Sequence, residues 1–279
     1  MNPGALFCLL LAHFIADFPL QSNYILKLRE DGDLKKSLQG ACLHAGVHFV
    51  TSILSVIYFW SWKMVLVVAV ISLAHIVIDF LKSRLINKYP SKRYNISIFL
   101  LDQILHLLVI CSALYGINRA SAVSPLFRTE HGETRIFISG SLAGATYNQK
   151  LVLALMLVVI GLWGTGVFIR IVLAKMSLLS RKGKDGTDPE PESDTPPKGE
   201  GAIDGGFIIG ILERFFIIIS IVFNMQIVIG FILTVKSVAR LKKFDDEAFV
   251  EIFIIGSFIS FISAIIIGYA VKLLGVIPY

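Results

Sequence analysis

The chain has 279 residues, of which 55% are hydrophobic and only 16% are charged. An average soluble domain has about 45–50% apolar and about 25% charged residues, so the composition excludes an ordinary water-soluble domain. Several apolar runs reach about 20 residues, which is the length that crosses a hydrocarbon core of about 30 Å. The sequence therefore predicts an all-α fold, a polytopic bundle of transmembrane helices.

The formal net charge of +6 does not indicate a nucleic-acid-binding protein. The Lys and Arg residues stand in loops and at the ends of the apolar runs, as in other membrane proteins, and we expect no nucleic-acid partner. Cys8, Cys42 and Cys111 lie within apolar segments and form no C-x-x-C pair. Neither a disulfide framework nor a thiolate zinc site is expected.

The apolar runs predict six full spans and one re-entrant helical hairpin. The full spans are expected at residues 3–20, 40–60, 64–80, 96–117, 151–174 and 249–271. Residues 207–223 and 225–238 would form the hairpin, turning near Asn224. A single crossing through residues 207–238 is the alternative, but it would leave the basic residues that follow on the outer side, against the charge rule.

The domain organisation follows from these spans. Residues 1–175 are predicted to form a five-span bundle that carries a His/Asp site. Residues 176–205 are rich in charge and proline and lack apolar periodicity, which is typical of a disordered linker. Residues 206–279 would form a C-terminal membrane unit that contains the hairpin and the last span.

The orientation is predicted from the loop between the third and fourth spans. This loop carries five basic residues and no carboxylate, which places it in the cytoplasm: Lys82, Arg84, Lys88, Lys92 and Arg93. The linker would then also be cytoplasmic, and the N-terminus would lie outside. The expected localisation is a multi-pass protein of a bacterial cytoplasmic (inner) membrane.

Each of the first four spans carries two ligand-type residues four positions apart. The pairs are His13 with Asp17, His44 with His48, His75 with Asp79, and Asp102 with His106. A spacing of four places both side chains on one face of a helix, about one turn apart. With the predicted orientation, all four pairs fall in the cytoplasmic half of the bundle. We therefore expect them to meet at one depth.

Burial of these groups in a membrane requires compensation. An unpaired Asp at the centre of a span costs ~2.5–3.5 kcal/mol on translocon scales. Imidazole and carboxylate ligands suit zinc, with iron or manganese as alternatives. Five His and three Asp exceed the ligands of one catalytic zinc, and the surplus would bind a second metal or hold the ligands in place. Hydrogen bonds between helices are the alternative to a divalent metal. The predicted metal ligands are His13, Asp17, His44, His48, His75, Asp79, Asp102 and His106.

These motifs resemble a family of uncharacterised bacterial membrane proteins, domain of unknown function 3307. The resemblance covers most of residues 5 to 110, through His13-x3-Asp17-Phe18-x2-Gln21, His44-x3-His48, His75-x3-Asp79-x2-Lys82 and Asp102-Gln103-x2-His106. The last part of the chain resembles the longer members through Ile209-Gly210-x2-Glu213-Arg214 and Lys236-Ser237-x2-Arg240. Longer members tend to carry Glu-Tyr before the last span, whereas this chain has Glu251-Ile252. The resemblance implies no established activity.

The residues favour a metal-dependent membrane hydrolase that acts on a lipid or membrane-embedded substrate at the cytoplasmic leaflet. A bound metal would activate water, and Asp102, or else Asp17, would be the catalytic carboxylate that takes its proton. Membrane lipid is the expected partner. Two alternatives remain open: a transporter of divalent metal or protons, and a non-catalytic membrane scaffold or sensor. The sequence does not indicate an oligomeric state.

Overall fold

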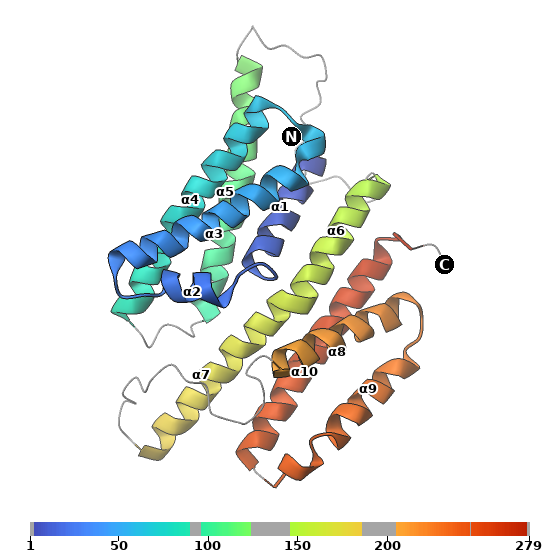
Figure 1. Ribbon diagram of the computed structural model, residues 1–279. Helices are drawn as coiled ribbons and strands as arrows, with labels where there is room; N and C mark the ends of the chain where they lie inside the picture. The colour runs from blue at the N-terminus through green and yellow to red at the C-terminus, as the bar shows by residue number, and fades with distance from the viewer. Residues whose placement is uncertain (1–2, 90–95, 124–145, 186–204, 246, 278–279) are drawn as a thin grey trace. The chain divides into compact units, whose positions relative to one another are not determined.

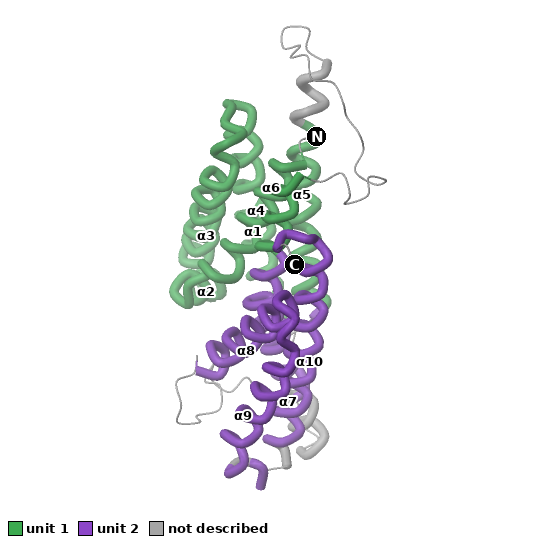
Figure 2. Tube along the Cα trace, turned by 90° about the vertical axis from the view of Figure 1, so that its right-hand side faces the viewer, with its two compact units in different colours: residues 1–93, 97–156 green, residues 94–96, 157–279 purple. Residues whose placement is uncertain are grey.

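Helices and no strands make up the regular secondary structure of the residues that the computed structural model describes, which are 3–89, 96–123, 146–185, 205–245 and 247–277 (Figure 1). The prediction of an all-α fold is confirmed. The chain divides into two compact units (Figure 2). Unit 1 contains residues 1–93 and 97–156, and unit 2 contains residues 94–96 and 157–279.

Unit 1 is a bundle of helices. They are α1 (Pro3–Asp17), α2 (Asn23–Arg29), α3 (Leu34–Ser55), α4 (Trp62–Lys88), α5 (Ile96–Val123) and the first part of α6 (Tyr147–Val159). A 3₁₀ turn (Ile57–Phe59) follows α3. Polar N-caps begin three of the helices: Ser22, Asp33 and Ser61 accept hydrogen bonds from the first-turn amides of α2, α3 and α4.

An apolar layer at one end of unit 1 packs α1, α4 and α5 together. Its buried members include Leu9 of α1, Ile71 of α4 and Ile110 of α5. Each of these residues has a histidine four positions away on the same helix face, namely His13, His75 and His106. The polar cluster of unit 1 therefore lies one helical turn from its apolar core.

Close packing of α2 against α3 depends on Gly40. A Cβ at this position would lie only 2.5 Å from the Arg29 amide nitrogen and 2.8 Å from the Leu28 carbonyl carbon. Ser37 of α3 donates a hydrogen bond of 2.8 Å to the Arg29 carbonyl oxygen. These contacts hold the end of α2 on α3 and fix the backbone position of Arg29.

Unit 2 contains the π-helical turn Ile160–Gly164, α7 (Thr165–Asp185), α8 (Gly205–Val222), α9 (Ile227–Val238), a 3₁₀ turn (Leu241–Lys243) and α10 (Glu247–Leu273). α8 and α9 form a helical hairpin at the predicted position, because the chain reverses between them (Figure 1). Asn224 occupies the turn with a φ of 60°. Asn is among the few residue types that tolerate this left-handed conformation.

Two cations, one buried and one half-buried, stabilise unit 2. The buried Arg214 of α8 donates to the Leu162 carbonyl oxygen from Nε and Nη2, at 3.1 and 2.5 Å, and from Nη1 to Ser260 Oγ at 3.2 Å. Leu162 lies in the π-helical turn. Such widened turns occur frequently at functional sites within helices. Lys236 of α9 lies 2.6 Å from Glu213 of α8, an ion pair that joins the two arms of the hairpin.

The prediction of six full spans is wrong in its count. Among the described residues, five helices are long and apolar enough to cross a membrane: Trp62–Lys88, Ile96–Gly116, Tyr147–Met176, Gly205–Val222 and Phe249–Leu273. α1, with 15 residues, extends about 22 Å, less than a typical hydrocarbon core. α3 has 22 residues, but its buried face carries His44, His48 and two serines, which lower its mean hydropathy. Conversely α8, predicted as a hairpin arm, has the length of a span.

The predicted linker is only partly described. α7 continues to Asp185, beyond residue 176, where the sequence predicts the linker to begin. Residues 186–204 lie outside the described residues.

Gly40→Ala tests the close approach of α2 and α3. The added Cβ forces the Arg29 backbone away, and such overpacking costs about 1–3 kcal/mol. We expect a lower midpoint of thermal unfolding in detergent. Gly46→Ala is the matched control on the same helix, because nothing lies within 4 Å of its Cβ. This control should be neutral or stabilising by up to about 1 kcal/mol. Equal midpoints for the two variants would show that the approach is not tight.

Candidate metal centre

Four helices of unit 1 bring the predicted ligand residues together. α1, α3, α4 and α5 each contribute one of the pairs recognised in the sequence. The eight side chains are nearly or completely buried, with exposed fractions between 0% for His44 and 8% for Asp17. On α3 the buried stripe also contains Gly40, Ala41 and Ala45, whose small size lets neighbouring helices approach the histidines.

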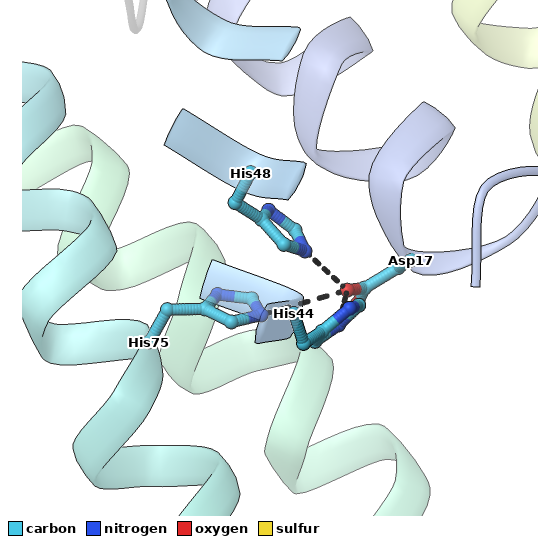
Figure 3. Close-up of side chains that lie close together, drawn as sticks. All are labelled: Asp17, His44, His48 and His75. Atoms are coloured by element: carbon cyan, nitrogen blue, oxygen red, sulfur yellow. Dashed lines mark hydrogen bonds and ion pairs between the residues drawn. The ribbon is translucent and has the colours of Figure 1, made fainter. Parts of the chain in front are cut away.

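Three imidazoles converge on a single oxygen of Asp17 (Figure 3). The distances to Asp17 Oδ1 are 2.9 Å from His48 Nε2, 3.2 Å from His44 Nε2 and 3.6 Å from His75 Nε2. The ligand atoms of these four residues lie within 4.8 Å of one another. Asp17, at the C-terminal end of α1, thus lies at the centre of the cluster.

The separations between these atoms match those of metal ligands. With bonds of about 2.0–2.1 Å, neighbouring ligand atoms of a tetrahedral zinc lie about 3.4 Å apart. The three Oδ1–Nε2 distances, 2.9, 3.2 and 3.6 Å, bracket this value. The side chains present therefore fit a divalent metal with little rearrangement.

The charges of the cluster are only partly balanced. Arg29 lies 2.8 Å from Asp79, and Lys82 lies 2.6 Å from Asp102. Within the described part of the chain, by contrast, the ion pairs of Asp17 are with histidines alone. With neutral imidazoles, three carboxylates and two cations leave one uncompensated negative charge. A bound cation would balance it.

The remaining predicted ligands surround this core. His13, Asp17 and His106 form a second group of ligand atoms within 4.8 Å, and His75, Asp79 and His106 form a third. Asp102 belongs to none of these groups among the described residues. Its Oδ1 lies 3.8 Å from His106 Nδ1, so the structure places Asp102 beside the cluster.

Sequence reasoning missed one residue of the centre, Arg29, and did not find the partner of Lys82. Ser22 and the apolar residues after it signal the short helix that buries Arg29. Lys82, predicted as a charge of the cytoplasmic loop, pairs with Asp102 of another helix. Gln103 of α5 donates an interhelical hydrogen bond to Asp17 Oδ2, at 2.9 Å.

A double-mutant cycle tests the Arg29–Asp79 pair. Arg29→Met leaves the Asp79 carboxylate buried without its cation, and breaking one side of such a pair costs about 3–5 kcal/mol. Arg29→Met combined with Asp79→Asn removes both charges and should recover most of this loss. The free energy of unfolding in detergent is the measurement. Strict additivity of the two single changes would mean that the pair is not coupled.

One part of the chain matches a known protein family. No curated protein and no solved structure matches it. Residues 5–131 match the model of a family described as "Protein of unknown function (DUF3307)", and this segment contains all eight residues of the candidate metal centre. The family that the motifs resemble is therefore confirmed for this segment: residues 5–131 form a DUF3307 domain.

Proposed function

We propose that this membrane protein is a metal-dependent hydrolase. Its metal is a divalent ion, in the first place zinc, held by Asp17, His44, His48 and His75. The observation that carries the proposal is the convergence of three imidazole nitrogens, at ligand-like separations, on a buried carboxylate that has no Lys or Arg partner among the described residues. Imidazole and carboxylate donors suit zinc.

A metal in this position supplies an activated nucleophile, because it lowers the pKa of a bound water toward neutrality. Arg29 holds the neighbouring Asp79 by a 2.8 Å bond to Oδ2. This contact keeps Asp79 in place beside His75, whose Nε2 lies 3.5 Å from the same oxygen.

Asp102 is the general base of the proposed reaction. Its Oδ2 is held by Lys82, whereas its buried Oδ1 has no hydrogen-bond partner and can accept a proton. As the carboxylate takes the proton of water, the water oxygen forms a bond to the carbonyl carbon or phosphorus of the substrate. The C–O or P–O bond to the leaving group breaks, and the departing oxygen receives the proton from Asp102.

An apolar groove on α3 supports a membrane lipid as the substrate. The groove has a volume of about 650 Å³ and is lined by Leu20, Leu43, Val47 and Val50, among others. Leu43 and Val47 directly precede His44 and His48 in the chain, but neighbouring residues of a helix project about 100° apart, so the groove lies on another face of α3 than the two buried histidines. An acyl chain in this groove would lie against the outer side of the helix that carries two of the ligands.

The basic loops support the placement of the site at the cytoplasmic leaflet. The experiment uses a cysteine-free chain with single substitutions Lys88→Cys, His131→Cys and Glu190→Cys. In intact bacterial cells, a membrane-impermeant thiol reagent should label position 131, whereas positions 88 and 190 should react only after permeabilisation. Positions 131 and 190 lie outside the described residues. Labelling of position 88 in intact cells would move the site to the outer leaflet.

Metal analysis tests the proposed ligands. Wild-type protein purified in mild detergent should retain at least one zinc per chain. His44→Ala and His75→Ala should each lose the zinc of this site, because one of four ligands is removed. His131→Ala, a histidine predicted to lie in an external loop, is the matched control and should keep the wild-type content. Folded wild-type protein that holds no metal and takes up none from added Zn²⁺ would overturn the proposal.

Turnover separates a hydrolase from a transporter. Proteoliposomes of phosphatidylethanolamine and phosphatidylglycerol should release fatty acid or a phosphorylated headgroup, measured by mass spectrometry. Asp102→Asn should keep the metal but lose this activity at least about 100-fold, because the amide cannot take a proton at neutral pH. Zn²⁺ transport without lipid cleavage by wild-type protein would instead identify the centre as a transit site.

A further inference from the structure

We infer that the centre binds a second divalent metal, held by Asp17 Oδ2, His13 and His106. The inference rests on the proposed function, because it assigns Asp17 Oδ1 to the first metal. Asp17 would then bridge two ions, one on each oxygen of its carboxylate. Two observations carry this arrangement.

The first is the orientation of the Asp17 carboxylate. Its Oδ1 faces His44, His48 and His75, whereas its Oδ2 faces other groups. His13 Nε2 lies 3.6 Å from Oδ2, which again is close to the separation of about 3.4 Å expected between two ligands of one tetrahedral ion. Oδ2 also accepts a 2.9 Å hydrogen bond from Gln103 Nε2 and retains a second lone pair for an ion.

The second observation is a set of buried nitrogen atoms without partners. His13 Nε2 and both ring nitrogens of His106 make no hydrogen bond, although the exposed fractions of these residues are 2% and 3%. A buried polar atom without a partner costs about 1–3 kcal/mol. The ligand atoms of His13, Asp17 and His106 lie within 4.8 Å of one another, so one ion can satisfy all three residues.

His106 also approaches His75 and Asp79, and its assignment follows from what those residues already bind. His75 Nε2 lies 3.6 Å from Asp17 Oδ1 and belongs to the first metal. Asp79 Oδ2 receives a hydrogen bond from Arg29. His13, by contrast, has no other metal set to join among the described residues. His106 therefore completes the site of His13.

The two ions would lie about 3.5–4 Å apart, the separation found in two-metal hydrolytic sites, where both ions act on one substrate group. Two Mn²⁺ ions at this distance are magnetically coupled, and their electron paramagnetic resonance spectrum differs from that of a single ion.

The experiment counts metals in the full-length chain in detergent. Wild type should bind two Zn²⁺ per chain, and His106→Ala and His13→Ala should each bind one. His131→Ala should bind two. Wild type loaded with Mn²⁺ should give a coupled spectrum, and His106→Ala the spectrum of one ion. The two variants lie on different helices, and the wild-type spectrum decides the question even if both variants misfold.

The outcomes separate this inference from the proposed function. One Zn²⁺ in wild type, unchanged in His106→Ala and His13→Ala but lost in His44→Ala, would overturn the second site and leave the first intact. An uncoupled Mn²⁺ spectrum in wild type would likewise overturn the second site alone. No metal in wild type would overturn both.

Discussion

The Asp17 carboxylate is the constraint on which unit 1 depends. It is 8% exposed and, in the described part of the chain, has no Lys or Arg partner. A lone buried charge is so costly that the surrounding helices must supply hydrogen bonds or a cation. α1 presents this group at its end, α3 and α4 direct three imidazoles at one of its oxygens, and Gln103 of α5 donates to the other. The packing of four helices is thus organised around a single side chain.

A surrounding set of contacts holds the histidines in position. The apolar layer of Leu9, Ile71 and Ile110 begins one turn from the cluster, so the imidazoles rest on a packed core. On the polar side, Arg29 and Lys82 pair with the two other carboxylates. Each cation comes from a different element than its carboxylate, and these contacts therefore also tie α2 to α4 and α4 to α5. The groups that balance charge are the same groups that fix the bundle.

The charged side chains of unit 2 have different kinds of partners from those of unit 1. Arg214 bonds a carbonyl oxygen of a π-helical turn and a serine hydroxyl. Gly166 provides room, since a Cβ there would lie 2.9 Å from Arg214 Nη2. Glu213, its neighbour in sequence, points to Lys236 of α9 and ties the hairpin together. These polar contacts are each satisfied within unit 2, whereas the cluster of unit 1 retains unpartnered nitrogens. That difference is why the metal centre is proposed in unit 1.

The sequence by itself determined the all-α membrane fold, the hairpin at Asn224 and the four ligand pairs, because these depend on apolar run length and on spacing along one helix. It did not determine the span count, because the apolar runs predicted full spans for α1 and α3, whereas α1 has only 15 residues and the polar face of α3 lowers its hydropathy. Only the tertiary structure decided which partners meet: Arg29 with Asp79, Lys82 with Asp102, and three imidazoles on one oxygen of Asp17. These contacts join residues on different helices, and their geometry depends on helix rotation and close approach, as at Gly40. Spacing along a single helix carries no information about either.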